Sequence, residues 1–137
     1  MKKFVGLWID HEKGVLVTLE NEKETITKLA SGVEGHFRLS GGSRSSTPYG
    51  PEDIVPEKKP EERRKHELHR YYQKVIKTLR DADRIYIMGP GEAPRELEKE
   101  IREVQQMAPK LVGVDKTDKM TDRQIAAEVR KRFGVNL

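Results

Sequence analysis

The sequence predicts an α/β protein with a ribonuclease H-like arrangement, in which a five-stranded mixed sheet is covered by three main helices. Three short apolar or alternating runs, separated by turn residues, open the chain and predict an antiparallel meander. From about residue 61 onward, helical spacings of apolar residues alternate with short apolar runs, which predicts strands joined by helical crossovers. We therefore expect the strand order 3-2-1-4-5, counted along the chain.

The meander is predicted from the first thirty residues. Residues 3–9 form a nearly continuous apolar run, which is typical of a central strand buried on both faces. A turn at residues 10–14 separates this run from residues 15–19, whose apolar side chains alternate onto one face. After a second turn at Asn21, residues 24–29 alternate mostly polar side chains, which predicts a more exposed third strand.

A long amphipathic helix is predicted to begin near Glu61, because Pro60 suits a first helical turn. Apolar residues then recur at every third or fourth position, as on one face of a helix. They are Leu68, Tyr71, Tyr72, Val75, Ile76 and Leu79. The opposite face carries the cations Arg63, Arg70, Lys74 and Lys77.

The last part of the chain predicts two strands and two further helices. Residues 84–88 and 111–114 are the strands, and Gly89-Pro90-Gly91 is a structural turn whose glycine spacing differs from that of phosphate-binding loops. The second helix is expected from about Pro94, with Leu97, Ile101, Val104 and Ala108 buried. The third is expected to open with a capping box from Thr121 to Gln124, to bury Ile125, Val129 and Phe133, and to end at Gly134.

Composition excludes several classes of protein. A length of 137 residues suits one domain, residues 1–137. The absence of cysteine excludes disulfide scaffolds, Cys-ligated zinc and thiol catalysis. No segment approaches the ~20 apolar residues of a membrane span, and the first residues lack an apolar signal core. We therefore expect a cytoplasmic protein that has no membrane partner.

The positive charge is concentrated in one part of the chain. Residues 36–80 contain 11 Lys or Arg and six Asp or Glu, whereas the net charge of the whole chain is only +4. The excess therefore lies in the loop at about residues 31–60 and in the helix that follows. Basic segments of this kind often contact nucleic acid, although an ordinary solvated face explains them equally well at this point.

The tip of the loop is the most informative motif. Gly41 and Gly42 let a backbone approach a ligand closely, and successive N–H groups there can bind an anion. Ser43 and Arg44 could add contacts to phosphate, and a flexible tip without a ligand is the alternative. Few apolar residues anchor the segment 40–57, so we expect it to be mobile in the isolated protein.

Catalytic and metal sites receive little support from the sequence. Asp10 ends the first strand, where a two-metal nuclease would place a carboxylate, but residues 84–88 are followed by glycine instead of a second acid. Asp10 is therefore interpreted as a turn residue. His66 and His69 are spaced i, i+3 without a third ligand and are interpreted as surface or packing residues. We predict no catalytic residue, no metal and no cofactor.

Four segments together resemble a known family. They are the first hairpin at residues 8–17, the Gly41-Gly42-Ser43 tip, the basic helix from Arg63 and the turn at residues 85–91. In their order the chain resembles, over nearly its full length, the middle domain of the archaeal and eukaryotic class-1 peptide release factors and of Pelota, in a stand-alone form. In release factors this tip is Gly-Gly-Gln, which enters the peptidyl-transferase centre and promotes hydrolysis of peptidyl-tRNA.

The resemblance implies a ribosome- or RNA-associated domain whose partners are ribosomal RNA or tRNA. Because Ser43 stands in place of the glutamine, it implies binding without peptidyl-tRNA hydrolysis. The candidate nucleic-acid contacts are Gly41, Gly42, Ser43, Arg44, Arg63, Arg64, Arg70, Lys74 and Lys77. Two alternatives stay open: a hydrolase acting on peptidyl-tRNA or a metal-dependent nuclease, and a domain that acts through protein contacts, including a homo-oligomer.

Overall fold

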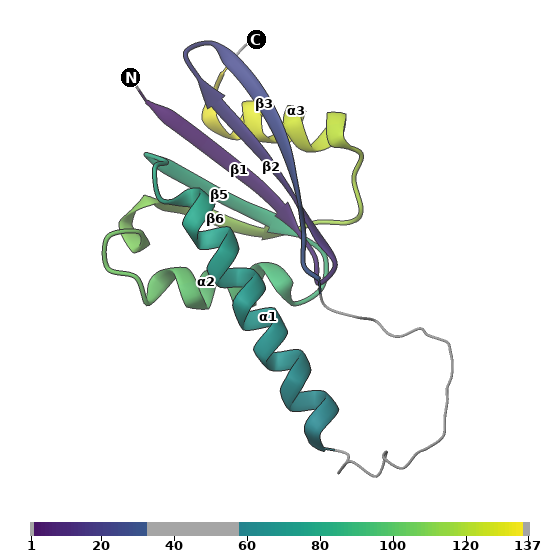
Figure 1. Cartoon of the computed structure of the whole chain (residues 1–137). Coiled ribbons are helices and arrows are strands. Elements are labelled where there is room, and N and C mark those ends of the chain that lie inside the picture. Colours follow the sequence, from purple (N-terminus) through teal and green to yellow (C-terminus); the bar gives the residue numbers. More distant parts are fainter. Residues whose placement is uncertain (1, 33–57, 136–137) are drawn as a thin grey trace.

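The computed structural model describes residues 2–32 and 58–135 (Figure 1). In chain order the elements are β1 (Lys3–Ile9), β2 (Lys13–Glu20), β3 (Lys23–Ala30), α1 (Lys58–Leu79), β5 (Arg84–Gly89), α2 (Ala93–Arg102), a short 3₁₀ helix (Ala108–Lys110), β6 (Leu111–Lys116) and α3 (Asp122–Phe133). The described strands form one open sheet of order β3-β2-β1-β5-β6. β1, β2 and β3 pair antiparallel, whereas β5 and β6 run parallel to β1. The predicted α/β class and strand order are confirmed.

Helices cover both faces of the sheet (Figure 1). α1 and α2 bury one face, and Leu7, Ile9 and Ile87 share one apolar core with the buried side chains of these helices. α3 buries the other face, against Trp8 and Val17. Burial of apolar surface stabilises a fold by about 25 cal/mol per Å². Because the central strand is buried on both faces, it is apolar at nearly every position.

The hairpin between β2 and β3 turns on two residues with positive φ. Asn21 has a φ of 54° and Glu22 a φ of 63°, and Glu20 pairs with Lys23 on either side of them. Two such residues make the turn whose twist matches that of the flanking strands, and asparagine tolerates this conformation well. The turn therefore sets the register of the whole β2–β3 pair.

Two sequence-based boundaries were wrong. The first turn is shorter than residues 10–14, because β2 begins at Lys13 and Gly14 already pairs with Ile9. The second helix ends at Arg102, so Val104 and Ala108 lie outside it. The chain tightens there into turns in which Met107 donates to the Val104 carbonyl, and Met107 takes the buried position that was predicted for Ala108.

The predicted ends of the third helix are confirmed. The Thr121 hydroxyl accepts a hydrogen bond from the Gln124 backbone N–H, and the Gln124 side chain accepts one from the Thr121 N–H. Gly134 ends the helix with a φ of 66°. Phe133 is only half-buried and stacks on Phe4, with 4.9 Å between the ring centroids. In the described parts of the chain, no helix is long and apolar enough to cross a membrane.

Candidate nucleic-acid interface

The candidate interface is the polar side of α1. This helix begins at Lys58, three residues before the predicted start. Its apolar side packs on the sheet through Tyr72, Val75 and Leu79, all of which are buried. The opposite side carries a row of four exposed cations, which we call the basic row: Arg63, Arg70, Lys74 and Lys77. The predicted amphipathic helix is therefore confirmed, and the first part of α1 extends past the ends of the strands (Figure 1).

The charges of the basic row are not neutralised within the described chain. None of the four forms an ion pair with a described residue, even though Glu67 lies one helical turn from both Arg63 and Arg70. Several cations elsewhere on the surface are paired. Arg102 contacts Glu98 at 2.9 Å, and Lys28 contacts Asp122 at 3.0 Å. The row therefore has its positive charge available for an anion from outside the described chain.

Arg64 lies apart from the basic row. It occupies the side of α1 that carries Leu68 and Tyr72, four and eight residues later, and its charge helps to lower the pKa of Glu96 on α2. Although Arg64 is exposed, its charge acts on a carboxylate of its own chain. The structure therefore separates it from the other predicted helix contacts.

The loop tip belongs to the same prediction but lies outside the described residues. This holds for Gly41, Gly42, Ser43 and Arg44, and for the predicted mobility of residues 40–57. Their part in an interface stays a prediction. The structure brings together only the helical part of the predicted site.

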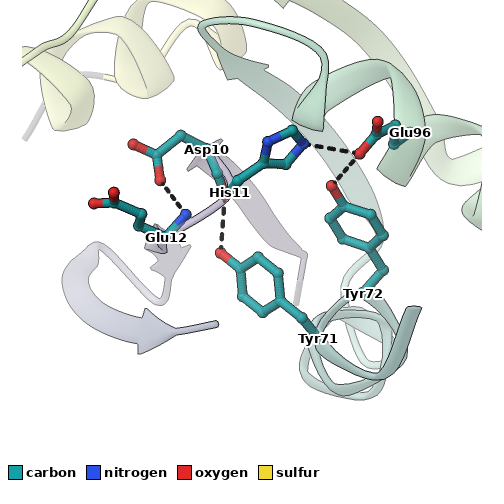
Figure 2. Close-up of polar contacts among 6 residues, drawn as sticks. All are labelled: Asp10, His11, Glu12, Tyr71, Tyr72 and Glu96. Carbon is teal, nitrogen blue, oxygen red and sulfur yellow. Dashed lines mark hydrogen bonds and ion pairs between the residues drawn. The ribbon is translucent and has the colours of Figure 1, made fainter. Parts of the chain in front are cut away.

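A polar junction that the sequence did not reveal lies where the β1–β2 turn meets α1 and α2 (Figure 2). His11 Nε2 lies 2.9 Å from Glu96 Oε1, and the Tyr72 hydroxyl donates to the same oxygen over 2.6 Å. Tyr71 donates to the backbone carbonyl of Asp10 over 3.4 Å. The junction thus joins three segments that are far apart in the sequence.

Asp10 acts in this junction as a turn residue, as predicted. Its Oδ1 accepts a hydrogen bond from the backbone N–H of Glu12 at 2.8 Å (Figure 2). The same oxygen accepts a second one from the backbone N–H of Lys13, also at 2.8 Å. This geometry holds the three-residue turn between β1 and β2. Among the described residues, no three His, Asp or Glu side chains are grouped so as to hold a metal ion.

The electrostatics of the junction favour a charged Glu96. Partial burial alone would raise the pKa of Glu96, but hydrogen bonds from Tyr72 and His11, together with Coulombic interactions with His11 and Arg64, lower it. Burial and the bond to Glu96 raise the pKa of Tyr72 far above its usual value, so this phenol stays protonated and donates. The junction is consequently a structural hydrogen-bond network centred on the Glu96 carboxylate.

A second contact between α1 and α2 continues this network. His69 Nδ1 lies 3.2 Å from Glu100 Oε2, and Gln73 donates to Glu100 Oε1 over 2.9 Å. His69 is therefore an exposed surface residue with a carboxylate partner, and His66 is exposed too, in keeping with the prediction of surface or packing residues. The signal that could have indicated the junction is the Tyr71-Tyr72 pair on the apolar face, because a buried tyrosine hydroxyl usually needs a partner.

The comparisons with known proteins identify the fold. No family model matches the chain, and no curated protein matches it. Pelota from Archaeoglobus fulgidus matches with a TM-score of 0.56 and 15% identity, over 95% of this chain and 31% of that one. Pelota from Thermoplasma acidophilum matches with a TM-score of 0.53 and 14% identity, over 95% of this chain and 32% of that one. The chain has the fold of part of Pelota.

This match confirms the expected resemblance to Pelota at the level of the fold. The chain spans about a third of the length of the two Pelota structures that it matches. An archaeal translation termination factor also matches, with a TM-score of 0.43 and 11% identity, over 96% of this chain and 39% of that one.

Proposed function

We propose that this chain is an RNA-binding domain that acts on the ribosome and is related to translation release and rescue factors. The observation that carries the proposal is the basic row, whose four cations lack partners in the described chain. The shared fold with part of Pelota and the Gly41-Gly42 tip support the ribosome as its place of action. Ribosomal RNA or tRNA is the proposed partner, in the cytoplasm.

The geometry of the basic row suits the phosphate backbone of a folded RNA. Arg63 and Lys77 are 14 positions apart, which corresponds to about 21 Å along a helix that rises 1.5 Å per residue. Four cations over that length can contact several phosphates, and such contacts position a protein without reading base sequence. The domain is therefore proposed to recognise RNA by shape and charge.

Peptidyl-tRNA hydrolysis is not part of the proposed activity. The resemblance assigns that reaction to a Gly-Gly-Gln tip, and Ser43 stands where glutamine would be. We propose that the tip contacts RNA through Gly41, Gly42 and Arg44 without releasing the peptide. Purified protein added to ribosomes that hold labelled peptidyl-tRNA should leave the ester intact, and release of peptide by the unaltered chain would contradict this.

The binding role is tested by removing the basic row. The variant Arg63→Ala/Arg70→Ala/Lys74→Ala/Lys77→Ala should weaken binding to structured RNA and ribosomes in filter-binding and co-sedimentation assays over a salt series. Each lost phosphate contact should reduce the log–log salt slope by about 0.7–0.9. These side chains are exposed, so stability should change by no more than about 0.5 kcal/mol per substitution.

A matched control removes the same number of charges from another part of the surface. Lys116, Lys119, Arg123 and Lys131 are exposed cations on β6, α3 and the segment between them. Their fourfold replacement by alanine should preserve most of the affinity and of the salt slope. Equal losses in the two variants would show that net charge alone drives binding. Unchanged affinity in the basic-row variant would reject this face as the RNA site.

A further inference from the structure

The two edge strands of the described sheet, β3 and β6, differ in how accessible their outward-facing backbone groups are. β6 carries an extra residue, Val112, opposite the step between Ile85 and Tyr86, and Arg132 Nη2 donates to the Val112 carbonyl over 3.3 Å. A bulge and a covering cation are two ways in which proteins block an edge strand. β3 is longer, pairs with β2 without a shift, and has no described strand on its outer side.

The hairpin geometry determines which backbone groups of β3 face outward. Glu20 and Lys23 flank a two-residue turn, so their backbone groups form hydrogen bonds with each other. From Lys23 onward, the backbone N–H and C=O groups of successive residues point alternately toward β2 and away from it. The Ser31 N–H, which donates to the Glu12 carbonyl, fits this alternation. The N–H and C=O groups of the even-numbered residues Glu24, Ile26 and Lys28 therefore point away from β2.

We propose that β3 pairs antiparallel with β3 of a second copy of this chain, about a twofold axis at Ile26. The strand reads Glu24-Thr25-Ile26-Thr27-Lys28, which is complementary to its own reverse. In this register Ile26 faces Ile26, each Thr25 faces a Thr27, and each Glu24 faces a Lys28. Every outward backbone group between Glu24 and Lys28 then meets a partner.

Other registers lose this complementarity. A shift by one residue places residues whose N–H and C=O groups point outward opposite residues whose groups point toward β2, because the two kinds alternate along each strand. The backbone hydrogen bonds between the two copies then cannot form. A shift by two residues places Glu24 opposite either Ile26 or Ala30, so that neither Glu24–Lys28 pair forms. Opposite charges across two strands stabilise pairing, and their loss therefore favours the register centred on Ile26.

The surroundings of β3 accommodate the second copy. Glu24 already contacts Arg130 of α3, and Lys28 contacts Asp122 at 3.0 Å, so pairing would create two rows of four charges that alternate in sign. α3 packs over β1 and β2. The two β2 strands would be three strand spacings apart, about 14 Å, which exceeds the roughly 8–10 Å between packed helix axes. The two copies of α3 therefore do not collide.

Cysteine cross-linking tests the register directly, because the chain contains no natural cysteine. Opposed hydrogen-bonded residues have Cα atoms about 5.5 Å apart, within the ~4.4–6.8 Å that a disulfide spans. Mild oxidation of Ile26→Cys should therefore give a product of twice the 15.8 kDa chain mass. Val112→Cys is the matched control, because Val112 is 41% exposed on the other edge and Ile26 is 40% exposed. Equal cross-linking of the two variants would reject the proposal.

Sedimentation equilibrium tests the unmodified association. The natural chain should show a concentration-dependent mass between one and two copies, in the absence of RNA. Ile26→Lys should weaken dimerisation by about tenfold or more, since two lysines would face each other across the axis. Val112→Lys should leave it unchanged, and circular dichroism checks the fold of both. A chain that stays monomeric up to millimolar concentration, or a dimer that Ile26→Lys does not weaken, would overturn the pairing.

Discussion

The Tyr72 hydroxyl donates to Glu96 Oε1 over 2.6 Å, and this hydrogen bond connects α1 to α2. His11 approaches the same oxygen to 2.9 Å from the β1–β2 turn. The Glu96 carboxylate therefore links the β1–β2 turn, α1 and α2. The orientation of the basic row depends in part on this junction.

Replacing Tyr72 by phenylalanine should reduce the free energy of unfolding by about 1–2 kcal/mol at neutral pH, because a hydrogen bond to a charged acceptor is lost. The pKa of Glu96 is lowered in the fold, so its ionised form stabilises the fold above the unfolded pKa of about 4.3. That contribution is lost as pH falls through the lowered folded pKa. The deficit of Tyr72→Phe should therefore shrink in acid, which denaturant unfolding at several pH values measures.

The neighbouring tyrosine provides the control for this prediction. Tyr71 donates to the uncharged carbonyl of Asp10 over a longer distance, 3.4 Å. Tyr71→Phe should cost less, and its cost should not decline in acid. A Tyr72→Phe deficit that stays constant from neutral pH to well below pH 4 would show that the Glu96 charge is not involved.

Arg63 and Arg64 offer a functional comparison of two adjacent cations. Arg63 belongs to the basic row, whereas Arg64 lies on the side of α1 that faces Glu96. Arg63→Ala should weaken RNA binding and lower the salt slope by about 0.7–0.9. Arg64→Ala removes the same charge but should change binding much less. Equal effects in a filter-binding assay would mean that the two sides of the helix are not distinguished by the RNA.

Gly89 and Gly91 flank one turn but tolerate substitution differently. Gly89 has a φ of 147°, and a Cβ there would lie 2.1 Å from the backbone oxygen of Ile9. Gly91 has a φ of 66° and open space around it. Gly89→Ala should therefore cost more than about 3 kcal/mol or prevent folding, since a backbone atom of β1 must move. Gly91→Ala should cost about 1–2 kcal/mol, the strain of its φ alone. Thermal unfolding of both variants decides whether the losses separate in this order.

Ionisation of the Tyr86 phenol should reduce the stability of the fold at alkaline pH. Burial, together with a hydrogen bond to Asp115 at 2.8 Å, raises its pKa to about 12. The protonated phenol is thus favoured by the fold, and its contribution, full below the unfolded pKa of about 10, is lost as pH rises toward 12.

Phenolate absorbance and denaturant unfolding between these pH values should both show the transition, and Tyr86→Phe should flatten the loss of stability. Asp115→Asn keeps an acceptor but removes the negative charge, so it should lower the pKa of Tyr86 only in part. An ordinary titration of Tyr86 near pH 10 would contradict this account.

The elements and their order were predictable because they depend on local patterns. The apolar run of β1, the helical spacing from Leu68 to Leu79 and the capping box at Thr121 each determine one element with little help from distant residues. The end of α2 was not predictable in this way. Its apolar spacing continues to Ala108, and packing against the sheet instead selected turns that bury Met107.

By itself, the sequence determined the fold class, the strand order, the amphipathic α1 and the cations that it carries. Only the tertiary structure decided how those cations divide, with Arg64 facing Glu96 and the basic row facing outward. It also decided that His11, Tyr72 and Glu96 meet and that β3 is left open while Arg132 covers β6. The physical reason is that charges, hydrogen bonds and edge groups find partners far away along the chain, whereas periodicity reports only on near neighbours.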